Sequence, residues 1–232
     1  MAEGASAPSV VFCIPTVTKP YQQCLDSLAA SIPLIKEAGW QEASVYEIGC
    51  PYISHARASM LRKALDAKAD VIVFIDHDLE WDPGDLLKLI STDGDVVSGV
   101  YRFKRDEEEY MGALLPTIEA LPQVRQDGCL KAHCVPAGFL KITKNAVNKF
   151  MLAYPELIYG PDQFALNIDL FNHGAHNGVW YGEDYAFSRR WIEKCGDIWI
   201  IPDLNLTHHS KDKAYPGNYH RYLLACPGGS EA

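Results

Sequence analysis

The chain has 232 residues, of which 48% are hydrophobic, so it can bury the core of one large or two small domains. Its formal net charge of -9 repels polyanions at long range, which argues against extended nucleic acid as a partner. The seven cysteines form no CxxC pair and indicate reduced, mostly buried thiols. The first nine residues lack a positive segment and a long apolar run, so we expect a cytoplasmic protein without a membrane span.

Strands and helices are predicted to alternate through the first hundred residues. Gly39 is expected to end the first helix, and Ser54 is expected to cap the second. This alternation predicts βαβ units and an α/β fold, with a mostly parallel central sheet flanked by helices. The predicted strands span 9–16, 42–50, 70–76 and 94–101, and the predicted helices span 22–39, 55–69 and 82–92.

The second half of the sequence is less regular. Residues 104–109, KRDEEE, form a charge run that we expect to be a solvated loop. A strand is predicted within 133–143, a helix from Asn145, a helix over 183–196 and a strand over 197–202. No repeat, low-complexity tract or Gly/Ser linker interrupts the chain, so a single domain is expected.

Two carboxylates follow the apolar run 71–75 directly, at Asp76 and Asp78. In an open α/β sheet, ligands bind beyond the carboxyl ends of the strands, where these two residues are expected to lie. A hard divalent cation is a natural ligand for such a pair, because Mg²⁺ and Mn²⁺ take one or two carboxylates together with phosphate oxygens. The alternative is a pair of surface acids at the end of a strand, which is the commoner explanation for an isolated DxD.

Several separated segments, taken in order, resemble the family 2-like glycosyltransferases of the GT-A fold. The resemblance implies a single Rossmann-like GT-A domain over 1–232, with a nucleotide-binding half at about 8–103 and an acceptor-binding half at about 104–220. One departure is Ala58, where the family often has Asn after Arg. The segments that carry the resemblance are VFCIPT, ISHARASMLRKAL, VIVFIDHDLEWDP, DVVSGVYRFK, PAGFLKIT, YGEDYAFSRRW and DIWIIPDLNLTHHS.

The resemblance implies a metal-dependent, inverting transfer of a sugar from a nucleotide-sugar donor, with a UDP-sugar as the default. It makes Asp78 a direct ligand of Mn²⁺ or Mg²⁺, while Asp76 holds the metal's waters or the ribose. His208 completes the metal site and is favoured over His209 by its place after IPDLNLT. The metal would stabilise the departing diphosphate as a Lewis acid.

Basic and strand-end residues are the expected contacts of the rest of the donor. Arg57 and Arg102 are expected near the phosphates, because a guanidinium can bind two phosphate oxygens at once. Lys104 is a third basic group expected near the phosphates; surface solvation is the alternative for all three residues and is favoured for Lys104. By the same resemblance, the base and ribose would lie against the ends of the first two strands, at Pro15, Thr16 and Glu47.

The segment WYGEDYAF supplies the expected catalytic group. By resemblance, Asp184 is the general base that deprotonates the acceptor hydroxyl, with Glu183 as an acceptor ligand or alternative base. The alternative is that both acids only balance a helix dipole. Trp180 and Tyr181 would form a stacking platform for the acceptor, and Gly138 would let a sugar approach the backbone.

Other functions use related patterns. A non-catalytic nucleotide-sugar or glycan-binding protein of the same fold stays open, because binding and catalysis use overlapping residues. A DxD phosphatase is less favoured, since its motif follows the first strand, whereas two strands precede Asp76 here. The acceptor itself is left open by the sequence: glycan, protein, lipid and a modified nucleobase all remain compatible.

Overall fold

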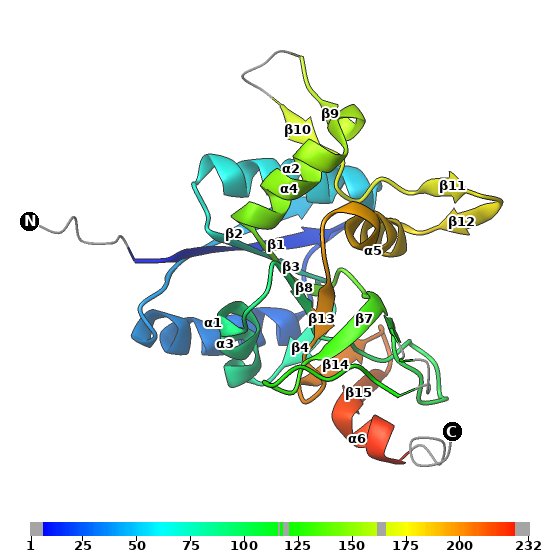
Figure 1. Cartoon of the computed structure of the whole chain (residues 1–232). Coiled ribbons are helices and arrows are strands. Elements are labelled where there is room, and N and C mark those ends of the chain that lie inside the picture. The colour runs from blue at the N-terminus through cyan, green and yellow to red at the C-terminus, as the bar shows by residue number, and fades with distance from the viewer. Residues whose placement is uncertain (1–6, 116, 118–120, 162–165, 226–232) are drawn as a thin grey trace, which may run out of the picture.

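A computed structural model describes residues 7–115, 117, 121–161 and 166–225 (Figure 1). Its centre is an eight-stranded sheet with the order β2-β1-β3-β8-β5-β13-β7-β6. The strands of this sheet are β1 Ser9–Thr16, β2 Gln41–Ile48, β3 Val71–Ile75, β5 Val96–Ser98, β6 Ala113–Leu114, β7 Leu130–Cys134, β8 Phe139–Thr143 and β13 Ile198–Ile200.

The direction of the strands confirms the predicted α/β class. Strands β1, β2, β3, β5, β6 and β13 run one way, whereas β7 and β8 run the other way. The sheet is therefore mostly parallel in strand direction, although β8 inserts between β3 and β5 and pairs antiparallel with both.

Helices cover both faces of the sheet (Figure 1). Alternate residues of β1 and β3 join two separate hydrophobic cores, as the period of two along a strand requires. One core contains residues of α2, α4 and α5, and the other contains residues of α1 and α3. The helices are α1 Gln22–Glu37, α2 Ile53–Asp66, α3 Pro83–Ser91, α4 Lys144–Ala153, α5 Glu183–Lys194 and α6 Tyr219–Ala225, with the short 3-10 helix η1 Pro155–Leu157.

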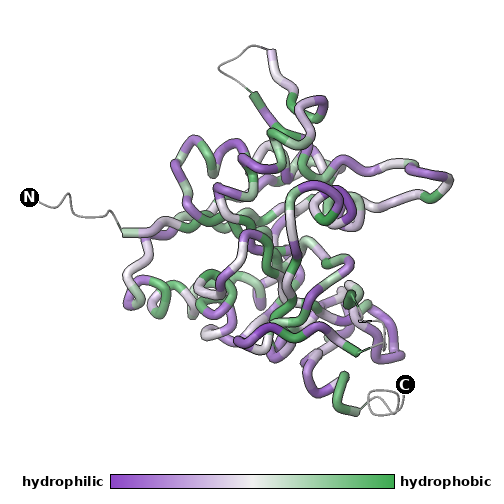
Figure 2. The backbone as a smooth tube through the Cα atoms, in the orientation of Figure 1, coloured by the Kyte–Doolittle hydropathy of each residue, from purple (hydrophilic) through white to green (hydrophobic). Residues whose placement is uncertain are grey.

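The buried strands are apolar along their length, which explains why the sequence predicts them well. All five residues of β3 are buried. In Figure 2 the hydrophobic colour gathers along the strands in the middle of the molecule. Because helices cover both faces of a parallel sheet, its inner strands are continuous apolar runs and do not alternate.

A second sheet joins the C-terminal part of the chain to the DxD segment. Strand β14 (Asn205–His209) lies between β15 (Ala214–Asn218) and β4 (Leu79–Trp81), and it pairs antiparallel with both. His208 is opposite Leu79 in this register, and the His209 amide donates to the Asp78 carbonyl at 2.8 Å. Residues about 130 positions apart in the sequence are thereby brought together.

Two small hairpins complete the fold. Strands β9 (Ile158–Tyr159) and β10 (Asn167–Ile168) form one pair, and β11 (Gly174–His176) and β12 (Val179–Tyr181) form the other. The β11–β12 hairpin projects from the body of the molecule beside α5 (Figure 1). Residues 175–180 of this hairpin are exposed.

Two local predictions differ from the structure, and a third, Gly39 at the end of the first helix, agrees with it. Tyr52, not Ser54, occupies the N-cap of α2, and Ser54 is buried inside the first turn, so the predicted cap is wrong. The segment 133–143 is not one strand, because Pro136 and Gly138 lie in the bend between β7 and β8. Gly39 follows α1 with a φ of +86°, a left-handed conformation that suits glycine at a helix end.

The described cysteines are all free, and four of them are buried, whereas Cys50 and Cys195 are partly exposed. Cys226 lies outside the described residues. Within the described part of the chain, no helix combines the length and the apolar composition that crossing a bilayer requires.

Candidate active site

A cleft of about 230 Å³ lies at the carboxyl ends of β1 and β3, the edge at which the sequence places the DxD pair. It also reaches the start of α2, the start of α5 and strand β14. Its lining contains most of the predicted site residues. The residues that line it are Pro15, Thr16, Val17, Cys50, Pro51, Ile53, Arg57, Asp76, His77, Asp78, Glu183 and His208.

Arg57 is the central cation of the cleft. Its side chain is only 3% exposed, and it donates from Nη2 to Asp76 Oδ1 at 2.9 Å and from Nη1 to Glu183 Oε1 at 2.7 Å. Its guanidinium also lies over the Phe171 ring, 5.3 Å from the centroid. Arg57, the fifth residue of α2, thus links the DxD turn to the start of α5.

The second oxygen of Asp76 is bound by a residue that the sequence did not single out. Tyr101 donates its hydroxyl to Asp76 Oδ2 at 3.0 Å, and its ring packs edge-on against the His208 ring. Burial, followed by the charge of Asp76, raises the pKa of Tyr101 well above its usual value, so the phenol stays a donor. The only sequence signal for this role was its place at the end of the predicted strand 94–101.

Gly138 shapes the cleft in a different way from the one expected. A Cβ at this position would overlap the Tyr101 hydroxyl and the Asp76 carboxylate. The space above the glycine is therefore filled by these two side chains and is not open to a sugar. The Asp76 amide also donates to the Gly138 carbonyl at 2.8 Å, which fixes the start of the DxD turn.

Asp78 is faced by nitrogen atoms at both carboxylate oxygens. Lys104 Nζ pairs with Oδ2, and His208 Nε2 lies 3.5 Å from Oδ1. Burial alone would raise the pKa of Asp78, but the hydrogen bonds and charges of His208 and Lys104 hold it well below its usual range. Asp78 is therefore ionised at neutral pH. Lys104, expected to be simply solvated, points instead into the site.

Asp78 and His208 fit a divalent metal as two of its ligands. His208 Nδ1 lies 2.8 Å from the Arg102 carbonyl, which can only accept, so we place the imidazole proton on Nδ1. Nε2, which lies 3.5 Å from Asp78 Oδ1, is then the ring nitrogen that could bind a cation placed between the two residues. Metal-binding histidines commonly donate their other ring N–H to a carbonyl in this way.

Asp76 is less suited to direct coordination, because Arg57 and Tyr101 already hold its two oxygens. Among the described residues, no group of three or more His, Cys, Asp or Glu side chains is arranged to hold a metal by itself. The chain therefore offers two ligands, and the remaining positions would be filled by phosphate oxygens and water, as Mg²⁺ sites commonly are.

The two acids at the start of α5 have different environments. Glu183 lines the cleft and pairs with Arg57, whereas Asp184 does not line it, makes no ion pair within the described part of the chain, and accepts from the Tyr185 amide at 2.8 Å. Burial first, and the charge of Glu183 second, raise the pKa of Asp184 to about 6. An acid with a raised pKa beside a neutralised one is the arrangement that general bases show.

Of the three residues predicted to contact the nucleoside, two line the cleft and one does not. Pro15 and Thr16 line the cleft, and Thr16 Oγ1 is buried without a hydrogen-bond partner in the described chain, so it is free to bind a ligand. Glu47 does not line the cleft and instead pairs with Lys63 at 2.8 Å, on the face of β2 toward α2.

Three other predicted residues lie outside the cleft. Arg102 turns its guanidinium toward the Asp106 carbonyl, 3.0 Å away, so only its backbone carbonyl reaches the site, through His208. Trp180 is 70% exposed on the β11–β12 hairpin and packs against the His173 ring. Tyr181 lies under the Arg189 guanidinium. The hairpin aromatics are therefore neighbours of the helix that carries Asp184 but not part of the cleft wall.

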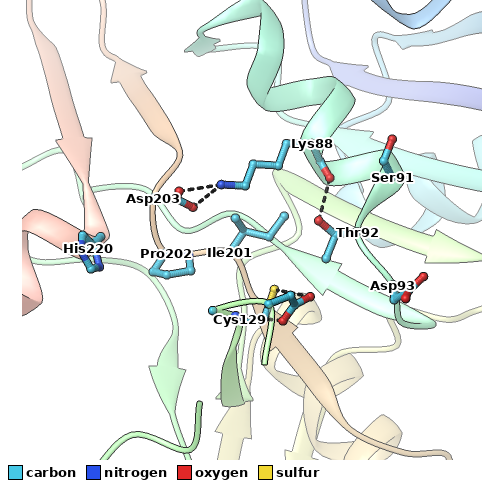
Figure 3. Close-up of a pocket in the computed structure, with 11 residues that line it drawn as sticks. Lys88, Ser91, Thr92, Asp93, Cys129, Ile201, Pro202, Asp203 and His220 are labelled. Atoms are coloured by element: carbon cyan, nitrogen blue, oxygen red, sulfur yellow. Dashed lines mark hydrogen bonds and ion pairs between the residues drawn. The ribbon is translucent and has the colours of Figure 1, made fainter. Parts of the chain in front are cut away.

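A larger cavity, of about 570 Å³, lies beside the end of α3 (Figure 3). We call it the α3 cavity; among the residues that line it are Lys88, Thr92, Asp127, Cys129 and Asp203. Lys88 pairs with Asp203 beside it, and Thr92 Oγ1 donates to the Lys88 carbonyl. Thr16 Oγ1, a buried hydroxyl without a partner in the described chain, belongs to the cleft and not to the α3 cavity.

No protein-family model and no curated protein matches the chain. Among solved structures, S. aureus TarS residues 1–349 align with 90% of this chain and 59% of that one, at 13% identity and a TM-score of 0.45. A glycosyltransferase involved in glycosylation of the major capsid of PBCV-1 aligns with 66% of this chain and 68% of that one, at 9% identity and a TM-score of 0.31. Likenesses this weak do not place the chain in a family, and the GT-A resemblance stays a prediction.

Proposed function

We propose that the protein is a metal-dependent glycosyltransferase that moves a sugar from a nucleotide-sugar donor to an acceptor hydroxyl. The observation that carries this proposal is that three functional groups lie on or next to one cleft. An ionised carboxylate beside a histidine and a buried arginine line it, and Asp184, whose pKa is raised, follows the lining residue Glu183. They come from four segments, of which Arg57 and His208 are about 150 positions apart, and such convergence is uncommon for groups that serve stability alone.

The residues divide the work of the proposed reaction between them. Asp78 and His208 would hold Mn²⁺ or Mg²⁺. The bound metal would supply Lewis-acid stabilisation for a leaving diphosphate. Arg57 holds Asp76 and Glu183 in place and adds positive charge to the floor of the cleft. In chain order, these groups come from α2, the DxD turn, α5 and β14.

Asp184 would act as the general base. Its pKa of about 6 leaves it ionised at neutral pH yet basic enough to accept the proton of an acceptor hydroxyl. Glu183 is held by Arg57 and is the weaker candidate, because that ion pair stabilises its ionised form. Direct attack by the deprotonated acceptor would invert the anomeric centre, which NMR of the product would establish.

The donor base would lie along Pro15, Thr16 and the segment 50–53, where the cleft is mainly apolar. The unpartnered Thr16 hydroxyl supplies a hydrogen bond for the base or ribose. A UDP-sugar is the first donor to test. The acceptor would approach from the side of α5, within reach of the exposed hairpin that carries Trp180 and Tyr181, and a single modified base remains among its possible classes.

The test is a donor screen by thermal shift and calorimetry, with UDP, GDP and their sugars, in Mn²⁺ and in EDTA. We expect one nucleoside diphosphate to bind at least ten times more tightly with Mn²⁺ than with EDTA. Asp78→Asn should abolish this metal effect, because it removes one of the two ligands. Equal binding in Mn²⁺ and EDTA would refute metal dependence.

A second assay separates catalysis from binding. Release of nucleoside diphosphate from the donor that binds should be measurable, and Asp184→Asn should reduce it while leaving donor affinity unchanged. Tight donor binding without release, in the presence of glycan, lipid, protein and nucleobase acceptors, would instead identify a non-catalytic nucleotide-sugar-binding protein.

A further inference from the structure

We propose that Lys104 is an internal counter-ion of Asp78 that the metal displaces, and that it then binds the diphosphate of the donor. This inference rests on the proposed function and names a donor-binding residue. The contact that motivates it is the ion pair between Lys104 Nζ and Asp78 Oδ2. The Lys104 side chain is 34% exposed and that of Asp78 is 12% exposed, so the ammonium enters the cleft from the solvent side.

The position of Lys104 conflicts with a metal on the same carboxylate. His208 Nε2 faces Oδ1 and Lys104 Nζ faces Oδ2, so both oxygens of Asp78 are covered by nitrogen. A divalent ion and an ammonium that share one carboxylate repel each other. Metal binding at Asp78 and His208 would therefore weaken the Lys104–Asp78 ion pair and favour release of the lysine head group.

The charge balance of the cleft explains why a lysine occupies this position. Three carboxylates line the cleft, at Asp76, Asp78 and Glu183, and Arg57 is shared by two of them. Lys104 supplies the counter-charge that Asp78 needs when no metal is present. A divalent metal would neutralise Asp78 in place of the Lys104 ammonium. The ammonium could then pair with the diphosphate of a donor bound to the metal.

The segment around Lys104 is built so that it can move. Residues 104–109 are all exposed, so a shift of this segment would not uncover apolar core. Its contacts are polar: the Phe103 amide donates to the Glu109 carbonyl at 2.9 Å, Arg105 pairs with Glu109 at 2.7 Å, and Asp106 pairs with Lys213 outside the segment. A lysine suits this role, since its charge sits on a flexible four-carbon stem.

Lys104→Met provides the test, with Mn²⁺ alone and then UDP as probes. Mn²⁺ affinity is measured by electron paramagnetic resonance without nucleotide, and UDP affinity by calorimetry at saturating Mn²⁺. We expect the variant to bind Mn²⁺ at least five times more tightly and UDP at least ten times more weakly than the unmodified chain. Lys104→Arg, which keeps the charge, should restore both affinities toward their original values.

Lys211→Met is the matched control, because it removes the same charge from an exposed side chain close to β14 in the sequence. It should change each affinity less than twofold. Unchanged or weaker Mn²⁺ binding by Lys104→Met, or unchanged UDP binding, would overturn the inference while leaving metal dependence intact. Absence of Mn²⁺ binding to both the unmodified chain and Lys104→Met would refute metal dependence and the inference together.

Discussion

The cleft and the α3 cavity are both lined by charged side chains, but the charges are arranged differently. In the α3 cavity, Lys88 is matched to Asp203, and Asp127 is matched to Arg125 beside it. In the cleft, one buried arginine is shared by Asp76 and Glu183, and Thr16 Oγ1 has no partner within the described chain. An unpartnered buried polar group costs stability, so it is expected where a ligand completes the arrangement. The comparison teaches that a shared buried cation and an unpartnered hydroxyl, rather than cavity volume, mark the candidate site.

The largest effect on turnover is expected at Asp184, the acid next to the cleft with the raised pKa. Asp184→Asn should lower turnover by about 10²- to 10⁴-fold, because it removes the proposed general base. In the unmodified chain, turnover should rise with pH through about 6, where Asp184 loses its proton. Single-turnover rates between pH 5 and pH 8 measure both effects. Normal turnover by the variant would remove Asp184 from the mechanism.

The effect of Asp184→Asn on the free energy of unfolding should depend on pH. The pKa of Asp184 is raised from 3.8 to about 6, so the folded state binds the proton more tightly than the unfolded state. Stability is therefore lost as pH rises between these two values, and Asp184→Asn should recover up to about 3 kcal/mol at pH 8. Urea unfolding at pH 8 and at pH 3.5 compares the two conditions. A gain of equal size at pH 3.5 would contradict this explanation.

The shared cation of the cleft should matter for folding as well as for binding. Arg57→Met should destabilise the protein by about 3 to 5 kcal/mol, because it leaves Asp76 and Glu183 without their buried partner. Urea unfolding at pH 7 measures this change. A loss below 1 kcal/mol would show that water replaces the guanidinium easily, and that the cleft is more solvated than the contacts indicate.

A smaller loss of stability is expected at Gly138, where the Tyr101 and Asp76 side chains pack against the backbone. Gly138→Ala should cost about 1 to 3 kcal/mol and weaken UDP binding, since its methyl group would displace Tyr101 and Asp76. Gly84→Ala is the matched control, because a Cβ there meets nothing within 4 Å and lies in α3. Thermal unfolding and calorimetry compare the two. If Gly138→Ala and Gly84→Ala have equal stability and UDP affinity, the Asp76 carboxylate does not need to keep its position in the structure.

The smallest effect is expected in the α3 cavity. Lys88→Met should change stability by less than about 1 kcal/mol, because the Lys88–Asp203 pair is about half exposed on both sides. Donor binding and turnover should not change. A large loss of turnover in this variant would contradict the distinction between the cleft and the α3 cavity. It would show that the α3 cavity contributes to the reaction.

Local patterns determined the fold class and the main elements. The predicted strand 9–16 matches β1 at both ends, and the predicted helix 82–92 differs from α3 by one residue at each end. Apolar periodicity and the positions of Pro and Gly are local signals, so they can be recognised without knowing which elements pack together. The alternation of these elements also placed Asp76 and Asp78 at the carboxyl edge of the sheet.

Tertiary structure alone decided which charges share the cleft. Arg57 meets Asp76 and Glu183 from 19 and 126 positions away, and neither pairing has a local signature. Lys104 turns inward to Asp78, whereas Glu47 pairs with Lys63 outside the cleft. Side-chain direction and ion pairing depend on how distant segments pack, because a charge settles with whichever opposite charge the fold brings nearest. The sequence determined which chemical groups were available, and packing determined which of them meet.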